Sequence, residues 1–318
     1  MCTAVSLFGE FSMFGRTLDV EGSFGEEIIV HRVKASDRLG KNDKFTLGIG
    51  IVRDGEPLYF DAVNSMGLAG AGLNLPYFTD YGNASEGTRS IASHSVIREV
   101  LSACNSVSEV KDYFSDAVIT DEAHSSGIEA TPLHWIFVDK DSSIVIESIG
   151  GSVTVYDNEW GVLANAPTFD FHNLNIRAFA PLRKSSVSLN DSFFPGVSYT
   201  RGLGALGLPG DLSSPSRFTR AVFFSRATSP QSTRCGEISR ILHVLDSVSV
   251  PRGSVLTETG KPLETVYTVC YDLSEQICYI KSYDGHSLSA VSLSDYMKTE
   301  IITRIPIVRE FSPRFITP

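Results

Sequence analysis

The sequence predicts an α+β fold, in which strands and helices gather in separate groups along the chain. Ten short segments are predicted strands, and Gly, Asp and Asn residues that favour turns separate many of them. Five segments are predicted helices, and they stand in a few groups instead of alternating with single strands. This grouping favours separate layers of strands and helices over repeated βαβ units.

The predicted elements follow a hairpin at the start of the chain. The predicted strands are Thr46–Val52, Pro57–Val63, Leu68–Leu73, His134–Asp139, Ser143–Ser148, Ser152–Tyr156, Gly161–Ala164, Val266–Asp272, Gln276–Ser282 and Ser287–Leu293. The predicted helices are Ile91–Cys104, Val107–Phe114, His172–Ala180, Pro215–Ala227 and Gly236–Leu245. Ser106 with Glu109 forms a capping box for the second helix, and Ser214 as N-cap followed by Pro215 begins the fourth.

The first residues predict a tight β-hairpin. Residues 3–8 and 11–14 are β-prone runs on either side of Gly9-Glu10, and a glycine at the first central position suits a two-residue type II′ turn. We therefore expect Phe8 to pair with Phe11. In that register Cys2 lies opposite Thr17, near the far end of the hairpin.

This register decides which side chains share a face with Cys2. Side chains alternate between the faces of a strand, so Asp19 lies on the face of Cys2, one diagonal step away at ~7–8 Å. Arg16 is equally near but faces the other way in a regular ladder, and it needs a bulge or a frayed strand end to reach the thiol. The alternative is a surface hairpin whose Arg and Asp have no function.

Cys2 directly follows Met1, and a small second residue favours removal of the methionine. Removal leaves a thiol and a free α-amine on one residue. An α-amine has a pKa of ~7.7–8.0, so it is partly neutral at pH 7 and can act as a base for the sulfur. A second-position residue usually has no catalytic role, so this hypothesis depends on the rest of the sequence.

The composition is that of an ordinary globular chain and argues against one class of partner. The 318 residues are 42% hydrophobic and 20% charged, with no repeat or low-complexity linker, so we expect a single domain over residues 1–318. Residues 306–318 contain three prolines and are expected to form an extended tail. The net charge of −10 argues against nucleic acid, which requires clustered Lys and Arg.

No targeting, membrane or metal motif is visible. Residues 1–15 contain no Lys or Arg, so we expect no signal peptide, and no run of eighteen apolar residues could span a membrane. The five cysteines are odd in number and lack metal spacing, and no HExxH or CxxC motif occurs. We therefore expect no metal, no other cofactor and a cytoplasmic location.

Two asparagines are candidates for stabilising an oxyanion. Asn74 and Asn165 each end an apolar strand, and a proline follows each of them two residues later. A side-chain amide at a strand end can donate a hydrogen bond to a developing oxyanion. Ordinary turn chemistry explains the same pattern, so both interpretations stay open. His134 and His172 are expected to be structural, which favours the amine of Cys2 over a histidine as the base.

Several motifs resemble the choloylglycine hydrolase family, which comprises bile salt hydrolases and penicillin V acylases. They are Met1–Thr3, Phe14–Asp19, Leu58–Ala62, Ala71–Asn74, Pro132–Trp135, Asn165–Asp170 and Gly207–Phe218. The resemblance runs in order from Cys2 to about residue 293. It implies a four-layer αββα sandwich of the N-terminal nucleophile hydrolase type, a small-molecule amide substrate and assembly as a homotetramer.

The resemblance also implies roles for six residues, and every one of these positions matches the family pattern. Cys2 is the nucleophile, its α-amine is the base, Arg16 lies beside the thiolate and Asp19 holds the amine. Asn165 stabilises the oxyanion together with Asn74 and a backbone amide, and Arg217 braces the polar network. The thiolate would attack the substrate amide, form an acyl-thioester and be released by water.

The substrate remains a choice between alternatives. Asn74 and the stretch Leu58–Asn64 resemble bile salt hydrolases, whereas Gly87–Ile97 is closer to penicillin V acylases. We favour conjugated bile salts, with penicillin V as the alternative. A catalytically silent binder of amphipathic acids, with Met1 retained, is the second alternative. Leu18, Tyr59 and Phe60 are candidates for the apolar wall of the substrate pocket, although each also suits the core.

Overall fold

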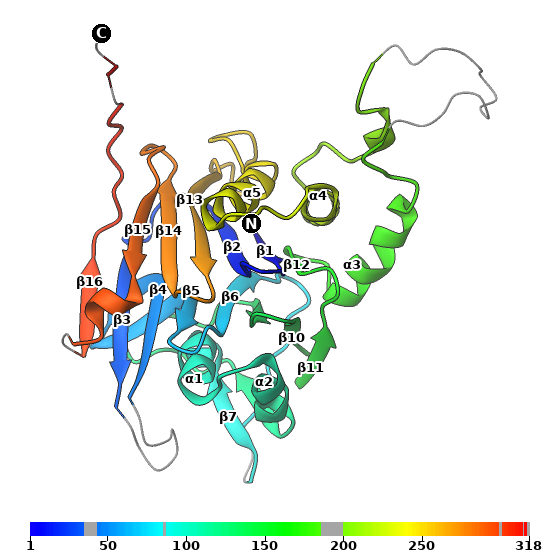
Figure 1. The fold of residues 1–318 in the computed structure, drawn as a ribbon. Helices are drawn as coiled ribbons and strands as arrows, with labels where there is room; N and C mark the ends of the chain where they lie inside the picture. Colours follow the sequence, from blue (N-terminus) through cyan, green and yellow to red (C-terminus); the bar gives the residue numbers. More distant parts are fainter. Residues whose placement is uncertain (35–42, 85–86, 186–199, 299–300, 314, 317–318) are drawn as a thin grey trace.

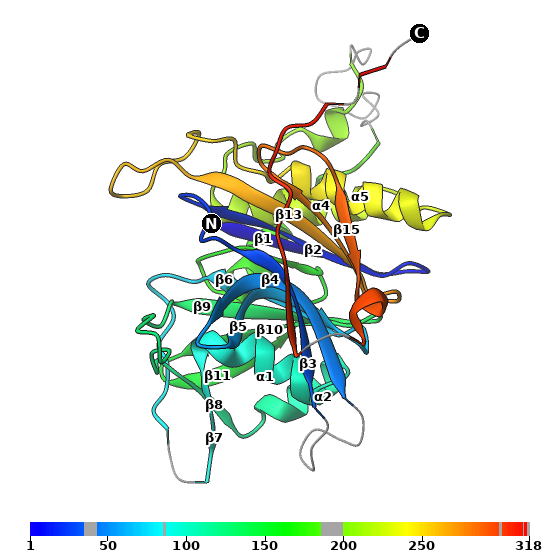
Figure 2. The ribbon, with the colours of Figure 1, turned by 90° about the vertical axis from the view of Figure 1, so that its left-hand side faces the viewer.

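Two β-sheets stack face to face in the computed structural model, and helices cover the outer face of each sheet (Figures 1 and 2). The structure describes residues 1–34, 43–84, 87–185, 200–298, 301–313 and 315–316. The layers follow in the order helices, six-stranded sheet, eight-stranded sheet, helices. The α+β class and the four-layer αββα sandwich are therefore confirmed.

The six-stranded sheet contains the first strand of the chain. Its order is β12-β1-β2-β13-β14-β15, and all neighbours are antiparallel. The bounds are β1 Cys2–Leu7, β2 Met13–Val20, β12 Val162–Leu163, β13 Glu264–Asp272, β14 Ile277–Ser282 and β15 Ser289–Ser292. Because β12 pairs with the open side of β1, the N-terminal strand is an interior strand.

The eight-stranded sheet has the order β11-β10-β9-β6-β5-β4-β3-β16. The bounds are β3 Glu27–Val33, β4 Lys44–Arg53, β5 Glu56–Asn64, β6 Ala69–Asn74, β9 Leu133–Val138, β10 Ser143–Ile149, β11 Ser152–Asp157 and β16 Ile302–Ile305. A separate parallel pair consists of β7 Arg89–Ala92 and β8 Ala117–Thr120.

Helices α4 and α5 pack on the six-stranded sheet, and α1 and α2 pack on the eight-stranded sheet. The bounds are α1 Val96–Ala103, α2 Val107–Phe114, α3 Phe169–Asn175, α4 Ser214–Ala227 and α5 Arg234–Asp246. Short 3-10 segments are η1 Ser93–Ser95, η2 Ile176–Phe179, η4 Leu203–Ala205 and η5 Leu293–Tyr296. None of the helices in the described ranges is long and apolar enough to cross a bilayer.

All ten predicted strands are present, but several predicted details are wrong. The helix predicted from Ile91 begins only at Val96, because Ile91 pairs with Ile119 in the β7–β8 pair. The third helix begins at Phe169, before the predicted His172. The N-cap of α4 is Ser213, one residue before the predicted Ser214. Strands β3, β7, β8 and β16 were not predicted.

The predicted register of the N-terminal hairpin is wrong by one residue. Cys2 pairs with Leu18, not Thr17, and five residues separate the two strands instead of a two-residue turn. The hydroxyl of Ser12 donates to the Lys140 carbonyl at 2.7 Å and anchors this longer loop to the other sheet. Since side chains alternate, the shift places Arg16 on the same face as Cys2 and turns Asp19 to the opposite face.

Two buried apolar clusters follow the layers. One extends from α4 and α5 through the six-stranded sheet to the inner face of the eight-stranded sheet, and the other lies between that sheet and α1 and α2. Cys270 and Cys278 are fully buried in the first cluster.

The C-terminal segment connects the two sheets in Figure 2. Strand β16 pairs with β3 of the eight-stranded sheet, and the Val308 carbonyl then accepts a hydrogen bond from Ser282 of β14 at 2.8 Å. Arg309 forms an ion pair with the buried Glu26 at 2.5 Å. The described part of the predicted tail is therefore packed against the sandwich near its start, whereas Phe311 and Phe315 are exposed.

Candidate active site

Cys2 is the first residue of β1, and its side chain lies between the two sheets, where only 3% of it is exposed. Its Sγ atom accepts a hydrogen bond from Nη2 of Arg16 at 2.7 Å. The observed hairpin register brings these side chains to one face, so no bulge or frayed end is needed. A guanidinium at this distance stabilises a negatively charged sulfur.

The guanidinium of Arg16 is held by two central strands of the opposite sheet, β5 and β6. Its Nη1 atom donates to the carbonyls of Phe60 at 3.0 Å and Gly72 at 3.2 Å. The pairing of β4 with β5 shifts at this point, so that Asp61 and Tyr59 have partners and Phe60 between them has none. This β-bulge leaves the Phe60 carbonyl free of the ladder and available to Arg16.

Asp61 completes the surroundings of Arg16, and sequence reasoning did not identify it. Its carboxylate lies 3.5 Å from Nη1 of Arg16 and accepts hydrogen bonds from the hydroxyls of Tyr267 and Tyr271, each at 2.5 Å. All four side chains are fully buried. A charged residue in the middle of the apolar β5 run is the signal that could have pointed to it.

Burial and the neighbouring charges have opposite effects on the pKa values of Arg16 and Asp61. Burial opposes the charge on Arg16, but its acidic neighbours, with Cys2 first and then Asp61 and Asp19, outweigh this effect and raise the pKa of Arg16. Burial raises the pKa of Asp61, against the lowering effect of Arg16 and the two tyrosines. Burial and Asp61 hold the pKa of both tyrosines well above the ordinary value, which keeps their hydroxyls as donors.

The main chain of Cys2 is bound on its other side by Asn165. The Cys2 nitrogen donates to Oδ1 of Asn165 at 2.5 Å, and Nη2 of Arg217 donates to the same oxygen at 2.8 Å. Nδ2 of Asn165 donates to the main-chain carbonyl of Asn74 at 2.8 Å. Asn74 therefore meets Asn165 through its carbonyl, and the second hydrogen on Nδ2 of Asn165 stays available to another acceptor.

Arg217 joins helix α4 to strand β1. It is fully buried, and its Nη1 atom donates to the Cys2 carbonyl at 2.5 Å and to the hydroxyl of Thr3. Its Nε atom donates to the Leu212 carbonyl at 3.0 Å. Burial lowers the pKa of Arg217, against the raising effect of Asp19 and Cys2.

Asp19 lies on the face of the sheet opposite the thiol, so the expectation that it shares a face with Cys2 is wrong. Its carboxylate accepts hydrogen bonds from Thr265 at 2.6 Å and Thr17 at 3.1 Å, and lies 4.0 Å from Arg217. Its main chain pairs with Met1, whose terminal amine donates to the Asp19 carbonyl. With Met1 in place, the Cys2 nitrogen is an amide.

Three polar side chains fix the main chain around Asn165. The hydroxyl of Ser214 accepts from the Asn165 nitrogen and donates to its carbonyl, both at 2.8 Å. Nε2 of His172 lies 2.8 Å from the same carbonyl, and His134 bridges the Ala164 carbonyl at 2.8 Å and Glu147 at 2.9 Å. Both histidines are thus structural in their contacts, as the sequence predicts.

The three predicted pocket residues occupy different environments. Leu18 is buried in the apolar cluster between the sheets, and Tyr59 is buried on the α1 side of β5. Phe60 is half-buried and packs edge to face against the exposed ring of Phe24, with 5.7 Å between centroids. Of the three, Phe60 is the most exposed, and the assignment of all three to the pocket wall stays a prediction.

Six residues named from the sequence therefore share one location. Cys2, Arg16, Asn165 and Arg217 are linked by direct contacts, and Asp19 and the main chain of Asn74 lie beside them. Among the residues that the structure describes, no group of three or more His, Cys, Asp and Glu side chains is placed to hold a metal ion. An N-terminal cysteine strand in a sandwich of two antiparallel sheets between helical layers defines an N-terminal nucleophile hydrolase.

Comparison with known proteins identifies the family. Residues 2–300 match the model of the linear amide C–N hydrolases, choloylglycine hydrolase family. A bile salt hydrolase/transferase of Lactiplantibacillus plantarum is 35% identical, with 98% of each chain covered, and one of Clostridium perfringens is 34% identical, with 92% of this chain and 93% of that protein covered. The chain belongs to the choloylglycine hydrolase family, and the resemblance found in the sequence is confirmed.

Solved structures agree with this assignment. A mutant of the conjugated bile acid hydrolase from Clostridium perfringens superposes with a TM-score of 0.87 at 31% identity, covering 100% of both chains. The penicillin V acylase from Agrobacterium tumefaciens superposes with a TM-score of 0.74 at 19% identity, covering 95% of this chain and 90% of that one. At that identity the second comparison shows a common fold.

Proposed function

We propose that this protein hydrolyses the amide bond of glycine- or taurine-conjugated bile salts through a thioester on Cys2. The contact of 2.7 Å between the Cys2 sulfur and the Arg16 guanidinium carries the proposal, because it places a permanent cation beside a candidate nucleophile at the start of the chain. The names of the relatives support this choice of substrate, since they are bile salt hydrolases and conjugated bile acid hydrolases.

The reaction begins when removal of Met1 turns the Cys2 nitrogen into an amine. The amine takes the proton of the thiol, and the sulfur attacks the carbonyl carbon of the substrate amide. The remaining hydrogen on Nδ2 of Asn165 can donate to the oxyanion, with Asn74 as a second donor. The carbon–nitrogen bond then breaks, and the protonated amine gives its proton to the leaving glycine or taurine.

Water completes the reaction. It attacks the thioester carbonyl while the Cys2 amine takes its proton, the carbon–sulfur bond breaks, and the bile acid leaves with the thiol restored. In this scheme Arg16 stabilises the thiolate, and Arg217 positions Cys2 and Asn165. The negative carboxylate of Asp19 stabilises the protonated form of the Cys2 amine. The apolar pair Phe24 and Phe60 offers a surface for the steroid body beside Arg16.

A release assay with glycocholate, taurocholate and penicillin V tests the proposal. We expect release of glycine or taurine to be much faster than release of phenoxyacetate. Faster cleavage of penicillin V would replace the proposal with the acylase alternative, for which the Agrobacterium structure supplies the shared fold. If none of the three is cleaved while the intact mass shows that Met1 is absent, the silent binder or another acyl-amide substrate replaces it.

We also propose that residues 1–318 form one domain and that the chain works as a cytoplasmic homotetramer. The family resemblance supports the assembly, and the five free cysteines suit a reducing compartment. Light scattering on the purified protein tests the assembly: a mass near four times 34.6 kDa is expected, and a single-chain mass would contradict it.

A further inference from the structure

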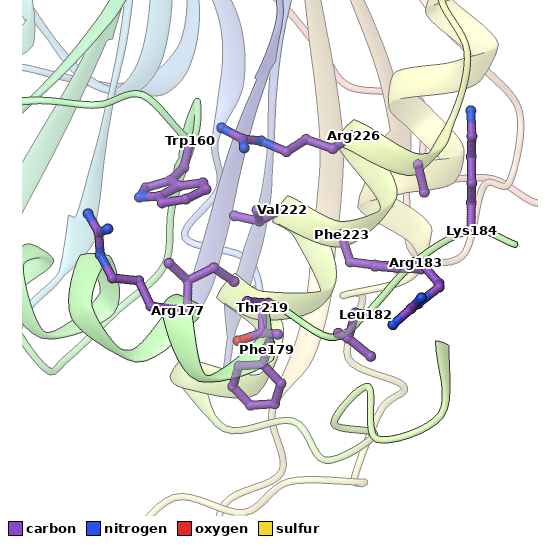
Figure 3. Close-up of a pocket in the computed structure, with 13 residues that line it drawn as sticks. Trp160, Arg177, Phe179, Leu182, Arg183, Lys184, Thr219, Val222, Phe223 and Arg226 are labelled. Atoms are coloured by element: carbon purple, nitrogen blue, oxygen red, sulfur yellow. The ribbon is translucent and has the colours of Figure 1, made fainter. Parts of the chain in front are cut away.

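A cavity of about 640 Å³ lies outside the two-sheet sandwich, between helix α4 and the segment that follows α3 (Figure 3). Its aromatic and aliphatic lining includes Trp160, Phe179, Val222 and Phe223. A volume of this size is within the range of small-molecule sites, roughly 300–1,000 Å³. None of the residues that contact Cys2 lines it, so it is separate from the candidate active site.

Four cations line the same cavity. Arg177, Arg183, Lys184 and Arg226 come from three neighbouring segments, and no carboxylate is among the lining residues. In the described parts of the chain, the ion pairs of the structure involve other cations and leave these four without a carboxylate partner. A cluster of unpaired cations is unexpected in a protein with a net charge of −10.

The geometry of Arg226 shows how the charged and aromatic parts of the lining meet. Its guanidinium lies 4.3 Å from the centre of the Trp160 ring, and Nη2 donates to the Glu159 carbonyl at 3.1 Å. Figure 3 shows this side chain extending from α4 towards the indole. The arginine is therefore held against an apolar surface, with donors left for an anion.

A polar group at the base of the cavity lacks a partner. Thr219 is fully buried and lines the cavity, and its hydroxyl makes no hydrogen bond to any described residue. Buried hydroxyls are usually hydrogen-bonded, so an unpaired one beside a cavity points to a polar group of a ligand or to water. Cations, aromatic rings and this hydroxyl are three independent features of one site.

We propose that this cavity binds an amphipathic organic anion, namely a carboxylate or sulfonate carried on a bulky apolar body. The acidic group pairs with cations of the lining, and the apolar body packs against Trp160, Phe179 and Val222. This inference concerns binding at a site that contains no nucleophile, and it does not depend on hydrolysis at Cys2.

Titration of glycocholate into Cys2→Ala protein, below the micelle-forming concentration, tests the site by calorimetry. We expect one binding event at the cavity in addition to the event near residue 2. Arg177→Glu with Lys184→Glu should weaken the cavity event at least tenfold and leave the other unchanged. Arg53→Glu with Lys140→Glu makes the same change in charge at exposed positions outside the cavity and should retain both events.

The outcomes separate this inference from the proposed function. If the function is wrong, the event near residue 2 is absent and the cavity event remains. If the cavity inference is wrong, the Arg177→Glu and Lys184→Glu protein binds glycocholate in the same manner as its parent. Should that protein fail to fold by circular dichroism, Arg177→Gln with Lys184→Gln makes the same test without reversing the charges.

Fluorescence supplies a local readout, because the chain has two tryptophans and Trp135 is buried in the core. Cholate should change the emission of Trp160, Trp160→Phe should abolish the change, and the uncharged methyl ester of cholate should bind at least tenfold more weakly. Equal binding of the ester would overturn the role of the cations. No response of Trp160, as expected if a second copy of the chain covers the cavity, would overturn the site.

Discussion

The two arginines that contact Cys2 are both fully buried, yet their surroundings differ. Arg16 lies among ionisable groups, with the Cys2 sulfur at 2.7 Å and the Asp61 carboxylate at 3.5 Å. Arg217 donates mainly to uncharged oxygens, on the Cys2 main chain, Thr3 and Asn165, and its nearest carboxylate, Asp19, is 4.0 Å away.

The pKa shifts of the two guanidinium groups run in opposite directions as a result. Burial alone lowers the pKa of an arginine, and for Arg217 it outweighs the effect of Asp19. For Arg16 the surrounding negative charges outweigh burial and raise the pKa. The two arginines are therefore equally buried but differ in their pKa shifts. We infer that Arg16 stabilises negative charge on the sulfur of Cys2, and that Arg217 fixes the position of the Cys2 main chain.

Cys2→Ala should have the largest effect, because it removes the atom on which the proposed role of Arg16 depends. We expect no hydrolysis of glycocholate or taurocholate and a normal fold, since one small side chain replaces another and Arg217 keeps its bond to the residue 2 carbonyl. Cys2→Ser should be almost inactive, because a hydroxyl ionises far less readily than a thiol. Substantial turnover by purified Cys2→Ala protein would remove Cys2 from the mechanism.

Arg16→Lys should have the next largest effect on activity. A lysine keeps the charge but cannot contact the sulfur and two carbonyls together, so we expect turnover to fall on the order of 10²-fold, as for the loss of one preorganised donor. Alkylation of Cys2 by iodoacetamide should become slower, because the cation beside the sulfur is misplaced. Arg53→Lys, at an exposed position, is the control, and an unchanged alkylation rate for Arg16→Lys would contradict the electrostatic role.

Arg217→Lys should mainly affect stability. The substitution leaves buried acceptors on Cys2, Asn165 and Leu212 with fewer donors, so we expect the free energy of unfolding in urea to fall by about 1–3 kcal/mol. The alkylation rate of Cys2 should change less than in Arg16→Lys. If Arg217→Lys instead lowers the alkylation rate further, the assignment of the two arginines is reversed.

Substitution of His172 should have a smaller effect, namely on how the free energy of unfolding depends on pH. Burial lowers its pKa from 6.5 to about 4, so its contribution to stability is fully present above pH 6.5 and is lost as the pH falls towards 4. A fall in pKa from 6.5 to about 4 corresponds to roughly 3 kcal/mol of stability. Urea unfolding between pH 7 and pH 5 should show the decline, and His172→Gln should flatten it.

His31 is the matched control for this measurement. Burial also lowers its pKa to about 4, but no described contact joins it to Asn165. His31→Gln should flatten the same decline without reducing turnover, whereas His172→Gln should reduce turnover as well. An unchanged pH dependence in His172→Gln would show that the histidine is not buried in its neutral form.

Local patterns were sufficient to predict most elements of the fold. Helix α2 occupies Val107–Phe114 as predicted, with the Ser106 hydroxyl accepting from the Glu109 nitrogen at 3.2 Å. The short strands β7 and β8 were missed because each has four residues and gains its partner only through the fold. For the same reason Ile91 was assigned to a helix.

The residues of the candidate site were predictable, but their relative orientation was not. The α-amine chemistry pointed to Cys2, and the family resemblance supplied Arg16, Asn165 and Arg217. The prediction assigned Arg16 and Asp19 to the wrong faces of the hairpin. The observed register includes a longer loop, which is anchored by a hydrogen bond from Ser12 to Lys140, 128 positions away. Asp61 was missed because its importance depends on tyrosines from a distant strand.

The bulge at Phe60 shifts the alternation of side chains along strand β5 by one residue. Tyr59 packs on the helical side, Phe60 and Asp61 both serve the inner side, and Ala62 returns to the helical side. The two halves of the strand are thus out of phase by one residue. Deleting Phe60 would restore a regular alternation with residues 56–59 on their present faces, and it would remove the carbonyl that holds Arg16, so among related sequences a gap at this position should be rarer than any substitution of the ring.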